Sequence, residues 1–497
     1  MNVGALLARQ AHERPAHPAL LFGEEELTYR ELAERVARLA GWLGARGLGP
    51  GDRVGIVQWN GPRLLETLLA AFHGGYVAVP LNARSTPFEA AQVLEDADVA
   101  AVIHGPEYTE HAETAPSAVR LSLDDYDAAL GAAPIPVAGV RPDDPAWLFY
   151  TSGTTGRAKG ATLTHRNLLA MVMAALADLR SAEPEHIVIH AAPLTHGSGL
   201  YALPALARGA TQAITTSRTF DPEELLQTIE ERGATDVAFL TPTMVKWVVE
   251  AQVAAPYDLS SLEHLVYGGA PMYRDDLAAT LDILGPVVSQ IYGQAEAPVT
   301  ISRLTRHEHL HALRKRPELL GSAGRPYTCV EVRTAADDEI VVRGDVVMRG
   351  YWRNDEATAE TVRDGWLHTG DVGRIDEEGY LHLLDRSKDM IISGGANIYP
   401  REVEEVLLEH PAVRQVTVIG APDEEWGERV VAVLSLHHGR TADEVRPELD
   451  ALCRTRLAGY KRPRQYDTVP ELPTSSYGKI LKREVRESYW QGHARRV

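Results

Sequence analysis

The sequence predicts an α/β protein with a large and a small domain. Up to about residue 145, helical patterns alternate with short apolar runs, as in the strand Val54–Val57, the helix Pro62–Phe72 and the strand Tyr76–Pro80. This βαβ alternation is typical of parallel sheets covered by helices. From about residue 325 the pattern changes to short strands with tight turns, which indicates a β-rich subdomain. A charge cluster at residues 385–389 then separates a small α+β unit.

Length and composition narrow the function classes. A chain of 497 residues is too long for one compact core, so at least two domains are expected. Its hydrophobic content of 44% and charged content of 24% are typical of globular proteins. The net charge of −19 argues against binding nucleic acid or an anionic membrane through the whole surface. A local basic pocket for phosphates remains compatible with that charge.

Cysteines and apolar runs carry little information about function. The two cysteines, Cys329 and Cys453, lie far apart and indicate neither a disulfide framework nor a zinc site. The first ten residues lack the apolar core of a signal peptide, and no run approaches about 18 apolar residues. We therefore expect a cytoplasmic protein without a membrane-spanning helix. The oligomeric state, a homodimer included, stays open.

The segment at residues 150–160 predicts a phosphate-binding loop. It follows an apolar run that reads as a buried strand, and it combines four hydroxyl residues, three glycines, Arg157 and Lys159. Glycines let backbone N–H groups converge on an anion, and Lys159 adds a positive charge. The spacing is not that of a Walker A motif. A second strand at residues 161–164 predicts a hairpin, with a helix from about Arg166; a flexible linker is the alternative interpretation.

Four further predicted strands end in polar or glycine-rich sequence: 187–191, 236–240, 265–267 and 287–292. In open α/β sheets, ligands bind at the carboxyl ends of strands, so these ends predict one site. After the third strand, the small residues of the turn 268–271 would let a flat base lie against the backbone. After the fourth, Tyr292 offers a stacking face and Glu296 a carboxylate for Mg²⁺, which prefers oxygen ligands.

The motifs together resemble the acyl-adenylate-forming enzymes, which include acyl- and aryl-CoA ligases, adenylation domains of peptide synthetases and firefly luciferase. The resemblance runs from Thr28 to about Glu487. It rests on the loop at 150–160, the Gln290–Glu296 and Trp366–Asp371 segments and Pro473–Ile480, in family order. One departure is Ala295, where the family has a threonine whose hydroxyl contacts phosphate.

The resemblance implies roles for individual residues. Catalytic roles fall to Lys479, Glu296 and His196, and Glu296 would also hold Mg²⁺. Lys388 would be the hinge, with domains at 1–385 and 389–497 joined by residues 386–388 and the small domain mobile. The acyl pocket would be formed by His196, Gly197, Ser198, Gly268 and Gly293, and the coenzyme A tunnel by Gly394 and Gly395. ATP or AMP would be bound by Thr151, Ser152, Gly153, Thr154, Thr155, Gly156, Lys159, Gly269, Ala270, Pro271, Gln290, Tyr292, Gly293, Asp371 and Arg386.

The predicted function is ATP-dependent activation of a carboxylic acid, a small-molecule substrate. The carboxylate attacks the α-phosphate to give acyl-AMP and pyrophosphate, and Lys479 offsets the repulsion between the two anions. A thiol, coenzyme A, then displaces AMP. The alternatives are transfer to an amine or a carrier protein, or a non-catalytic nucleotide sensor. The sequence does not identify the acid. Lys482 and Arg483, near the end of the chain, are predicted to be surface charge.

Overall fold

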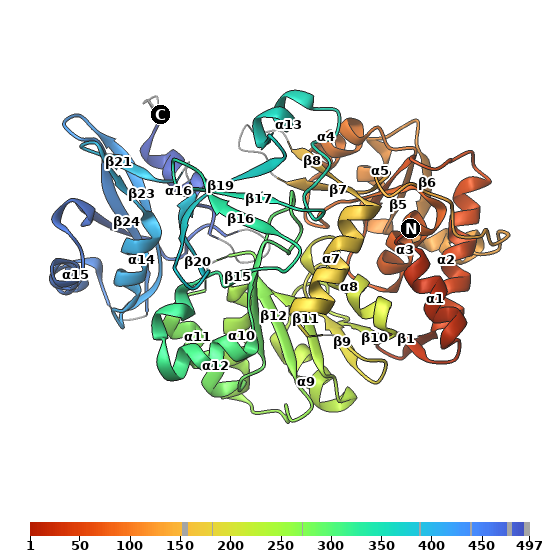
Figure 1. The fold of residues 1–497 in the computed structure, drawn as a ribbon, viewed down its shortest axis with the longest axis horizontal. Helices are drawn as coiled ribbons and strands as arrows, with labels where there is room; N and C mark the ends of the chain where they lie inside the picture. Colours follow the sequence, from red (N-terminus) through yellow and green to blue (C-terminus); the bar gives the residue numbers. More distant parts are fainter. Residues whose placement is uncertain are drawn as a thin grey trace. The chain divides into compact units, whose positions relative to one another are not determined.

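The chain forms two compact units in a computed structural model (Figure 1). The model describes residues 1–151, 158–180, 182–270, 272–386, 389–437, 440–474 and 480–491. The first unit comprises Met1–Val332 and Val342–His368, and the second Arg333–Val341 and Thr369–Val497. The mixed α/β architecture confirms the predicted fold class. The boundary at residues 386–388 stays a prediction.

A nine-stranded sheet forms one half of the first unit, in the order β15-β14-β13-β12-β11-β9-β10-β1-β2. The strands β9, β11, β12 and β13 are adjacent and parallel, so their carboxyl ends share one edge, as predicted. The outer pairs β1–β2, β13–β14 and β14–β15 are antiparallel. The bounds are β1 Pro18–Phe22, β2 Glu25–Thr28, β9 Ile187–His190, β10 Thr211–Ile214, β11 Asp236–Leu240, β12 His264–Gly268, β13 Val288–Tyr292, β14 Ser302–Leu304 and β15 Arg325–Pro326.

A six-stranded sheet forms the other half, in the order β6-β5-β3-β4-β7-β8. Its strands are β3 Arg53–Val57, β4 Val77–Pro80, β5 Ala101–His104, β6 Val119–Ser122, β7 Pro145–Thr151 and β8 Lys159–Thr164. Strands β3 to β7 pair in parallel, whereas β7 and β8 pair antiparallel with Thr151 opposite Lys159. The predicted hairpin is therefore confirmed. The predicted phosphate loop between these two residues, 152–157, lies outside the described residues.

Helices cover both sheets, and local caps determine where several begin. Thr28 and Glu31 form the predicted capping box at α2, and Asp221 caps α9. Each such cap stabilises its helix by about 1 kcal/mol. The α-helices of the first unit are α1 Ala5–Glu13, α2 Tyr29–Gly44, α3 Pro62–Gly74, α4 Pro87–Ala97, α5 Thr109–Glu113, α6 Tyr126–Ala129, α7 His165–Asp178, α8 Gly197–Arg208, α9 Pro222–Arg232, α10 Pro242–Ala254, α11 Arg274–Ile283, α12 Arg306–Lys315 and α13 Asp355–Thr361. The 3₁₀ helices are η1 Pro106–Tyr108, η2 Leu123–Asp125, η3 Pro317–Gly321 and η4 Gly459–Lys461.

The segment from residue 331 onward forms two five-stranded sheets. The first has the order β16-β17-β19-β18, with β20 beside β19; its strands are β16 Glu331–Thr334, β17 Glu339–Arg343, β18 Val362–Arg363, β19 Trp366–Ile375 and β20 Leu381–Arg386. The second has the order β22-β21-β24-β23, with β25 beside β24; its strands are β21 Ile391–Ser393, β22 Ala396–Ile398, β23 Val413–Asp423, β24 Gly427–Leu436 and β25 Gln465–Thr468.

Alternation along β23 and β24 places helices on both faces of the last sheet. Val416, Val418 and Leu434 pack in one apolar cluster with α14 (Pro400–Leu408) and α15 (Ala442–Arg456). The intervening residues, such as Ile419 and Val433, pack in a second cluster with α16 (Lys482–Tyr489). Successive strand residues face opposite sides, so one hairpin supports both clusters.

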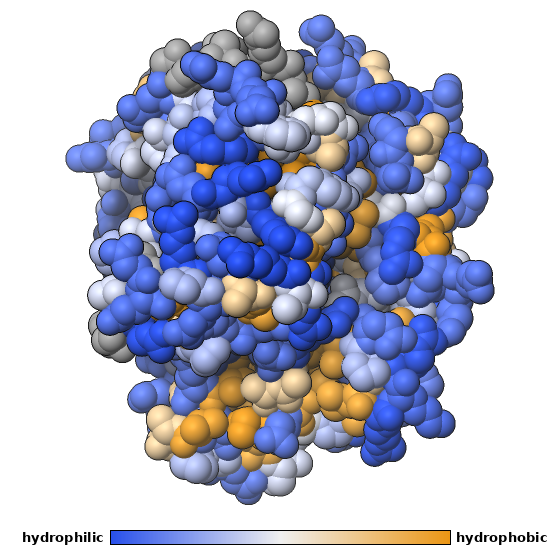
Figure 2. Space-filling model, turned by 90° about the vertical axis from the view of Figure 1, so that its left-hand side faces the viewer, coloured by the Kyte–Doolittle hydropathy of each residue, from blue (hydrophilic) through white to orange (hydrophobic). Residues whose placement is uncertain are grey.

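Polar side chains cover most of one face of the molecule (Figure 2). The face in Figure 2 is mainly hydrophilic, with apolar side chains gathered toward its lower edge. Exposed large apolar side chains include Trp247 and Val253 on α10 and Ile283 on α11. Among the described helices, none is long and apolar enough for a membrane span.

Candidate active site

The ends of β12 and β13 bring together the residues predicted to bind the nucleotide base. Tyr267 and Gln290 are opposite each other in the parallel register, and the Tyr267 hydroxyl donates to Gln290 Oε1 over 3.1 Å. Tyr267 is fully buried, so it holds the Gln290 side chain in place. The chain then turns at Gly269, whose φ of +80° favours glycine. Ala270 follows in this turn, and Pro271 lies outside the described residues.

An aromatic cluster lies beside this turn. The Phe149 ring meets His196 edge to face, with centroids 5.5 Å apart. Tyr201 stacks on Phe239 with centroids 6.4 Å apart. Gly197 begins α8 next to Phe239, and a Cβ on Gly197 would lie 3.0 Å from that ring. Two aromatic pairs, one on each side of Gly197 in the sequence, thus gather residues from β7, β11 and the start of α8.

His196 is a neutral base in this environment. Burial lowers its pKa to about 4, so the ring is uncharged at neutral pH. Its Nδ1 lies 2.9 Å from the Thr195 hydroxyl. A neutral imidazole can bind a substrate through hydrogen bonding or ring contact, but it supplies no positive charge.

Three predicted acyl-pocket residues have packing roles. Ser198 is fully buried, and its hydroxyl lies 2.8 Å from Nδ1 of His190, whose Nε2 lies 2.6 Å from Gln212 Oε1. Ser198 therefore anchors the first turn of α8, and its hydroxyl faces the interior. A Cβ on Gly268 would overlap the Ile291 carbonyl oxygen, and one on Gly293 would approach the Val299 backbone to 2.6 Å. Close packing explains both glycines, and their place in an acyl pocket stays a prediction.

Tyr351 links the two charged groups that the sequence assigned to phosphate and metal binding. Its hydroxyl donates to Glu296 Oε1 over 2.6 Å, and Lys159 Nζ lies 5.3 Å from the centre of its ring. Tyr351 reaches this position because residues 349–352 pair with β8, through Thr162 and Gly160. This tyrosine was not among the residues predicted from the sequence. Its glycine–aromatic setting, Gly350-Tyr351-Trp352, is a weak signal by itself.

The two residues predicted to contact the ribose form an ion pair. Asp371 on β19 and Arg386 on β20 are paired across the antiparallel register, and Arg386 Nε lies 3.0 Å from Asp371 Oδ1. Asp371 is buried, whereas the Arg386 side chain is 41% exposed. The preceding residue, Gly370, has a φ of +69°. A carboxylate fixed in this way can accept two further hydrogen bonds, which suits a vicinal diol.

The prediction that Lys482 is surface charge is wrong. Its Nζ lies 2.9 Å from Glu404 Oε1 and 3.8 Å from Asp385 Oδ2, and its side chain is 23% exposed. The prediction for Arg483 is confirmed, since its side chain is 60% exposed and pairs with Glu487 one turn on. Helical spacing turns the two neighbouring side chains in different directions.

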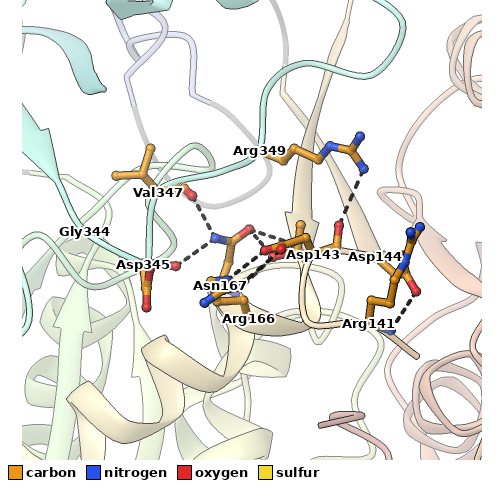
Figure 3. Close-up of a pocket in the computed structure, with 10 residues that line it drawn as sticks. Arg141, Asp143, Asp144, Arg166, Asn167, Gly344, Asp345, Val347 and Arg349 are labelled. Atoms are coloured by element: carbon orange, nitrogen blue, oxygen red, sulfur yellow. Dashed lines mark hydrogen bonds and ion pairs between the residues drawn. The ribbon is translucent and has the colours of Figure 1, made fainter. Parts of the chain in front are cut away.

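A polar cavity of about 630 Å³ lies elsewhere in the first unit (Figure 3). Asn167 donates to the backbone oxygens of Asp345 and Val347 over 2.7 and 2.8 Å. Basic and acidic side chains alternate around it, with Arg166 paired to Asp143 at 2.8 Å. None of its lining residues is a predicted site residue, and Arg141 and Arg166 pair with Asp144 and Asp143.

Comparison with known proteins identifies the family. The family model described as AMP-binding enzyme matches residues 7–352, and the model of its C-terminal domain matches residues 402–479. A feruloyl-CoA synthase from Amycolatopsis is 42% identical over 98% of this chain and 99% of its own. The chain belongs to the AMP-binding enzyme family.

Solved structures of this family share the fold. An amide bond synthetase from Marinactinospora thermotolerans matches with a TM-score of 0.88 and 33% identity over 98% of this chain and 99% of that one. An o-succinylbenzoate CoA synthetase from Bacillus subtilis, in complex with its acyl-adenylate, matches with a TM-score of 0.85 and 31% identity over 97% of both chains. The predicted enzyme class, an AMP-forming acid–coenzyme A ligase, is confirmed, with ATP, coenzyme A and a carboxylic acid as substrates.

The roles of several residues of this AMP-binding enzyme stay predictions. Lys388 and Lys479 lie outside the described residues, as do Ser152, Gly153, Thr154, Thr155 and Gly156. Gly394 and Gly395 form the turn between β21 and β22, with φ of +56° and +79°. A Cβ on Gly394 would overlap the Trp426 ring. Turn geometry thus accounts for both glycines, and a role beside coenzyme A is untested.

Proposed function

We propose that this ligase activates an aromatic carboxylic acid and transfers the acyl group to coenzyme A. The observation that carries the acid class is the presence of two aromatic pairs near Gly197, Phe149 with His196 and Tyr201 with Phe239. Aromatic pairs prefer offset or edge-to-face contacts, which an aryl ring of the substrate can extend. The similarity to feruloyl-CoA synthase supports the same class.

The proposed residues supply charge and orientation for two steps, acyl-adenylate formation and thioester formation. The carboxylate oxygen attacks the α-phosphate of ATP, and the bond to pyrophosphate breaks to leave acyl-AMP. Lys479 stabilises the negative charge that builds up between the reacting anions. Asp371 and Arg386 hold the ribose. The coenzyme A thiol then loses its proton to solvent and attacks the acyl carbon, and the bond between that carbon and the phosphate oxygen breaks to release AMP. The neutral His196 lies beside the proposed acyl site.

A product screen tests the acid and the acceptor together. Matched aromatic and aliphatic acids are supplied with ATP and either coenzyme A or a simple amine in excess, and the products are measured by mass spectrometry. We expect acyl-CoA from the aromatic acids. Higher kcat/KM for aliphatic acids would reject the acid class. Efficient amide formation without acyl-CoA would reject coenzyme A as the acceptor, and the chain is similar in structure to an amide bond synthetase.

We also propose that Glu296 holds Mg²⁺ together with the ATP phosphates. No cluster of three or more candidate ligands occurs among the described residues. A single carboxylate still fits, because Mg²⁺ keeps several waters and usually takes one or two carboxylates plus substrate phosphates. The Tyr351 hydroxyl fixes one Glu296 oxygen, which leaves the other available. When bound, the ion would neutralise phosphate charge.

Glu296→Gln should weaken the use of Mg²⁺–ATP while leaving the fold intact, because it removes the proposed metal charge and keeps the side-chain shape. The measurement is the Mg²⁺ concentration dependence of pyrophosphate release. Tyr351→Phe is the matched control, since it removes the hydrogen bond to Glu296 and keeps the carboxylate. An unchanged Mg²⁺ dependence in Glu296→Gln would reject the metal role.

Gly197→Phe should narrow acid selectivity. A Cβ at residue 197 already lies 3.0 Å from the Phe239 ring, so a benzyl group must fill the space beside the aromatic cluster. We expect kcat/KM to fall about 10-fold or more for bulky aromatic acids, the scale of a few misplaced methylenes in a pocket, and to fall less for small acids. A uniform loss for both would place Gly197 outside the acyl site.

The domain arrangement is part of the proposal. We infer that residues 386–388 form a hinge and that the C-terminal domain rotates there between the two steps. In many enzymes, such a domain movement completes the catalytic site. The small domain would bring Lys479 to the first step and the coenzyme A residues to the second. A cytoplasmic location and a homodimer stay predictions from the sequence.

A further inference from the structure

The second unit contains a buried charge cluster that the proposed reaction does not use. Lys482 Nζ lies 2.9 Å from Glu404 Oε1 and 3.8 Å from Asp385 Oδ2, and both carboxylates are buried. Burial by itself would lower the pKa of Lys482, but Glu404 and Asp385 outweigh it and raise that pKa. Burial raises the pKa of the Asp385 carboxyl. Buried ions persist only where their geometry and hydrogen bonds are well satisfied.

Backbone groups hold both carboxylates in place. Asp385 Oδ1 accepts from the Arg386 N–H over 2.8 Å, and its Oδ2 accepts from the Arg401 N–H over 3.1 Å. Glu404 Oε1 accepts from the Val418 N–H over 2.8 Å. The cluster therefore connects the end of β20, the start of α14, the strand β23 and the start of α16. Lys482 brings one positive charge to these two carboxylates.

The cluster's position in the chain relates it to the chemistry. Asp385 immediately precedes Arg386, which pairs with Asp371. Lys482 is the first residue of α16, close after the bridge between Thr474 and Ile480. The Leu481 N–H also donates to the Pro473 oxygen over 2.8 Å, which closes the base of the segment that carries Lys479. The ion pair of Lys482 and Asp385 therefore joins that base to the strand bearing Arg386.

The same ion pair spans the proposed hinge. Asp385 precedes residues 386–388, whereas Glu404 and Lys482 both follow them. A rotation at these residues would carry Lys482 and Glu404 together and separate them from Asp385. The contact between Lys482 and Glu404 can thus persist in both orientations of the domain. The contact between Lys482 and Asp385 can form in only one of these orientations.

We propose that Lys482 is a positioning residue for acyl-adenylate formation, which it favours by binding Asp385 across residues 386–388. This inference rests on the proposed function, in which Lys479 and the ribose pair act together in the first step. When the contact is made, Lys482 is held at Asp385 on β20, one residue before Arg386 of the ribose pair. The second step, from acyl-AMP to thioester, does not require it.

The test measures the two half-reactions of Lys482→Met separately. Loss of the positive charge should lower the rate of acyl-adenylate formation, measured as pyrophosphate release, by about 10²-fold. That is the scale of the loss when a distant mutation slightly misplaces the reacting groups. Thioester formation from supplied acyl-AMP should be largely unchanged. Lys482→Arg keeps the charge and should recover most of the first step. Arg483→Ala, which removes the neighbouring exposed cation, should change neither step.

A second variant keeps the test valid if Lys482→Met fails to fold. Lys482→Met/Glu404→Gln removes one buried charge of each sign and keeps an oxygen for the Val418 N–H. It should fold, as judged by its Tm, and still lose the first step selectively. Equal loss of both half-reactions, or a folded variant with wild-type adenylation, would overturn the inference. A wild-type enzyme that released no pyrophosphate with any acid would instead reject the proposed function.

Discussion

Lys479→Ala is expected to lower the rate of acyl-adenylate formation by about 10²–10³-fold, the cost of removing one donor that stabilises developing negative charge. The carboxylate and the α-phosphate are both anions, so their approach depends on a cation between them. Thioester formation from supplied acyl-AMP should be largely spared, because that step breaks the acyl–phosphate bond with no second anion approaching phosphorus. Pyrophosphate release and single-turnover thioester formation measure the two steps.

The control for this variant is Arg483→Ala, which removes a nearby positive charge that is exposed and paired with Glu487. It should leave both half-reactions unchanged. If Lys479→Ala lowered both steps by the same factor, Lys479 would not be the residue that bridges carboxylate and phosphate. The loss would then be assigned to the structure of the C-terminal domain.

Asp371→Asn should lower kcat/KM for ATP by about 10²-fold, within the range for truncating one partner of a hydrogen-bonded charge pair. The substitution keeps the side-chain shape but removes the charge opposite Arg386, whose Nε lies 3.0 Å from Asp371 Oδ1. The Arg386 side chain is 41% exposed, so solvent weakens its attraction to Asp371. We therefore expect the lost ion pair to account for only part of the fall in kcat/KM. The remaining loss would come from the ribose, which an amide holds less well than a carboxylate.

Asp376→Asn is the matched control for Asp371→Asn. Asp376 follows β19, and its carboxylate accepts from His382 over 2.9 Å, so it has a comparable partner on β20 but no predicted contact with nucleotide. It should change stability slightly and leave KM for ATP unchanged. Equal effects of the two variants on KM would remove Asp371 from the ribose site and indicate a general weakening of the sheet.

Features coded within a few residues could be predicted from the sequence. Thr28 and Glu31 are three residues apart, so the capping box can be recognised without tertiary information. The strands that end at residues 240, 268 and 292 show apolar runs followed by polar or glycine-rich turns, and the rule for parallel sheets then places their ends together. The hairpin of β7 and β8 follows from two short apolar runs with a glycine-rich connection.

Features that depend on distant partners could not. Lys482 looks like Arg483 in sequence, and only Asp385 and Glu404, on other elements, explain its burial. Tyr351 acquires its contact with Glu296 because its segment pairs with β8, which no local pattern indicates. The glycines at 268 and 293 looked like pocket residues, but the backbone beside them leaves no room for a Cβ.

The pairing of β8 with the segment around Tyr351 also has a consequence for synthesis. Ala161 and Tyr351 are about 190 residues apart, and they form a bridge that gives β8 a partner on its outer side. At about 5–20 residues per second, the ribosome takes about 10–40 seconds to make the intervening chain. During that time the nascent β8 exposes an unpaired edge beside an apolar strand, a template for wrong pairing. Mutations that slow the pairing of residues 349–352 with β8 should therefore reduce the yield of folded enzyme more than they reduce the free energy of unfolding of the folded enzyme.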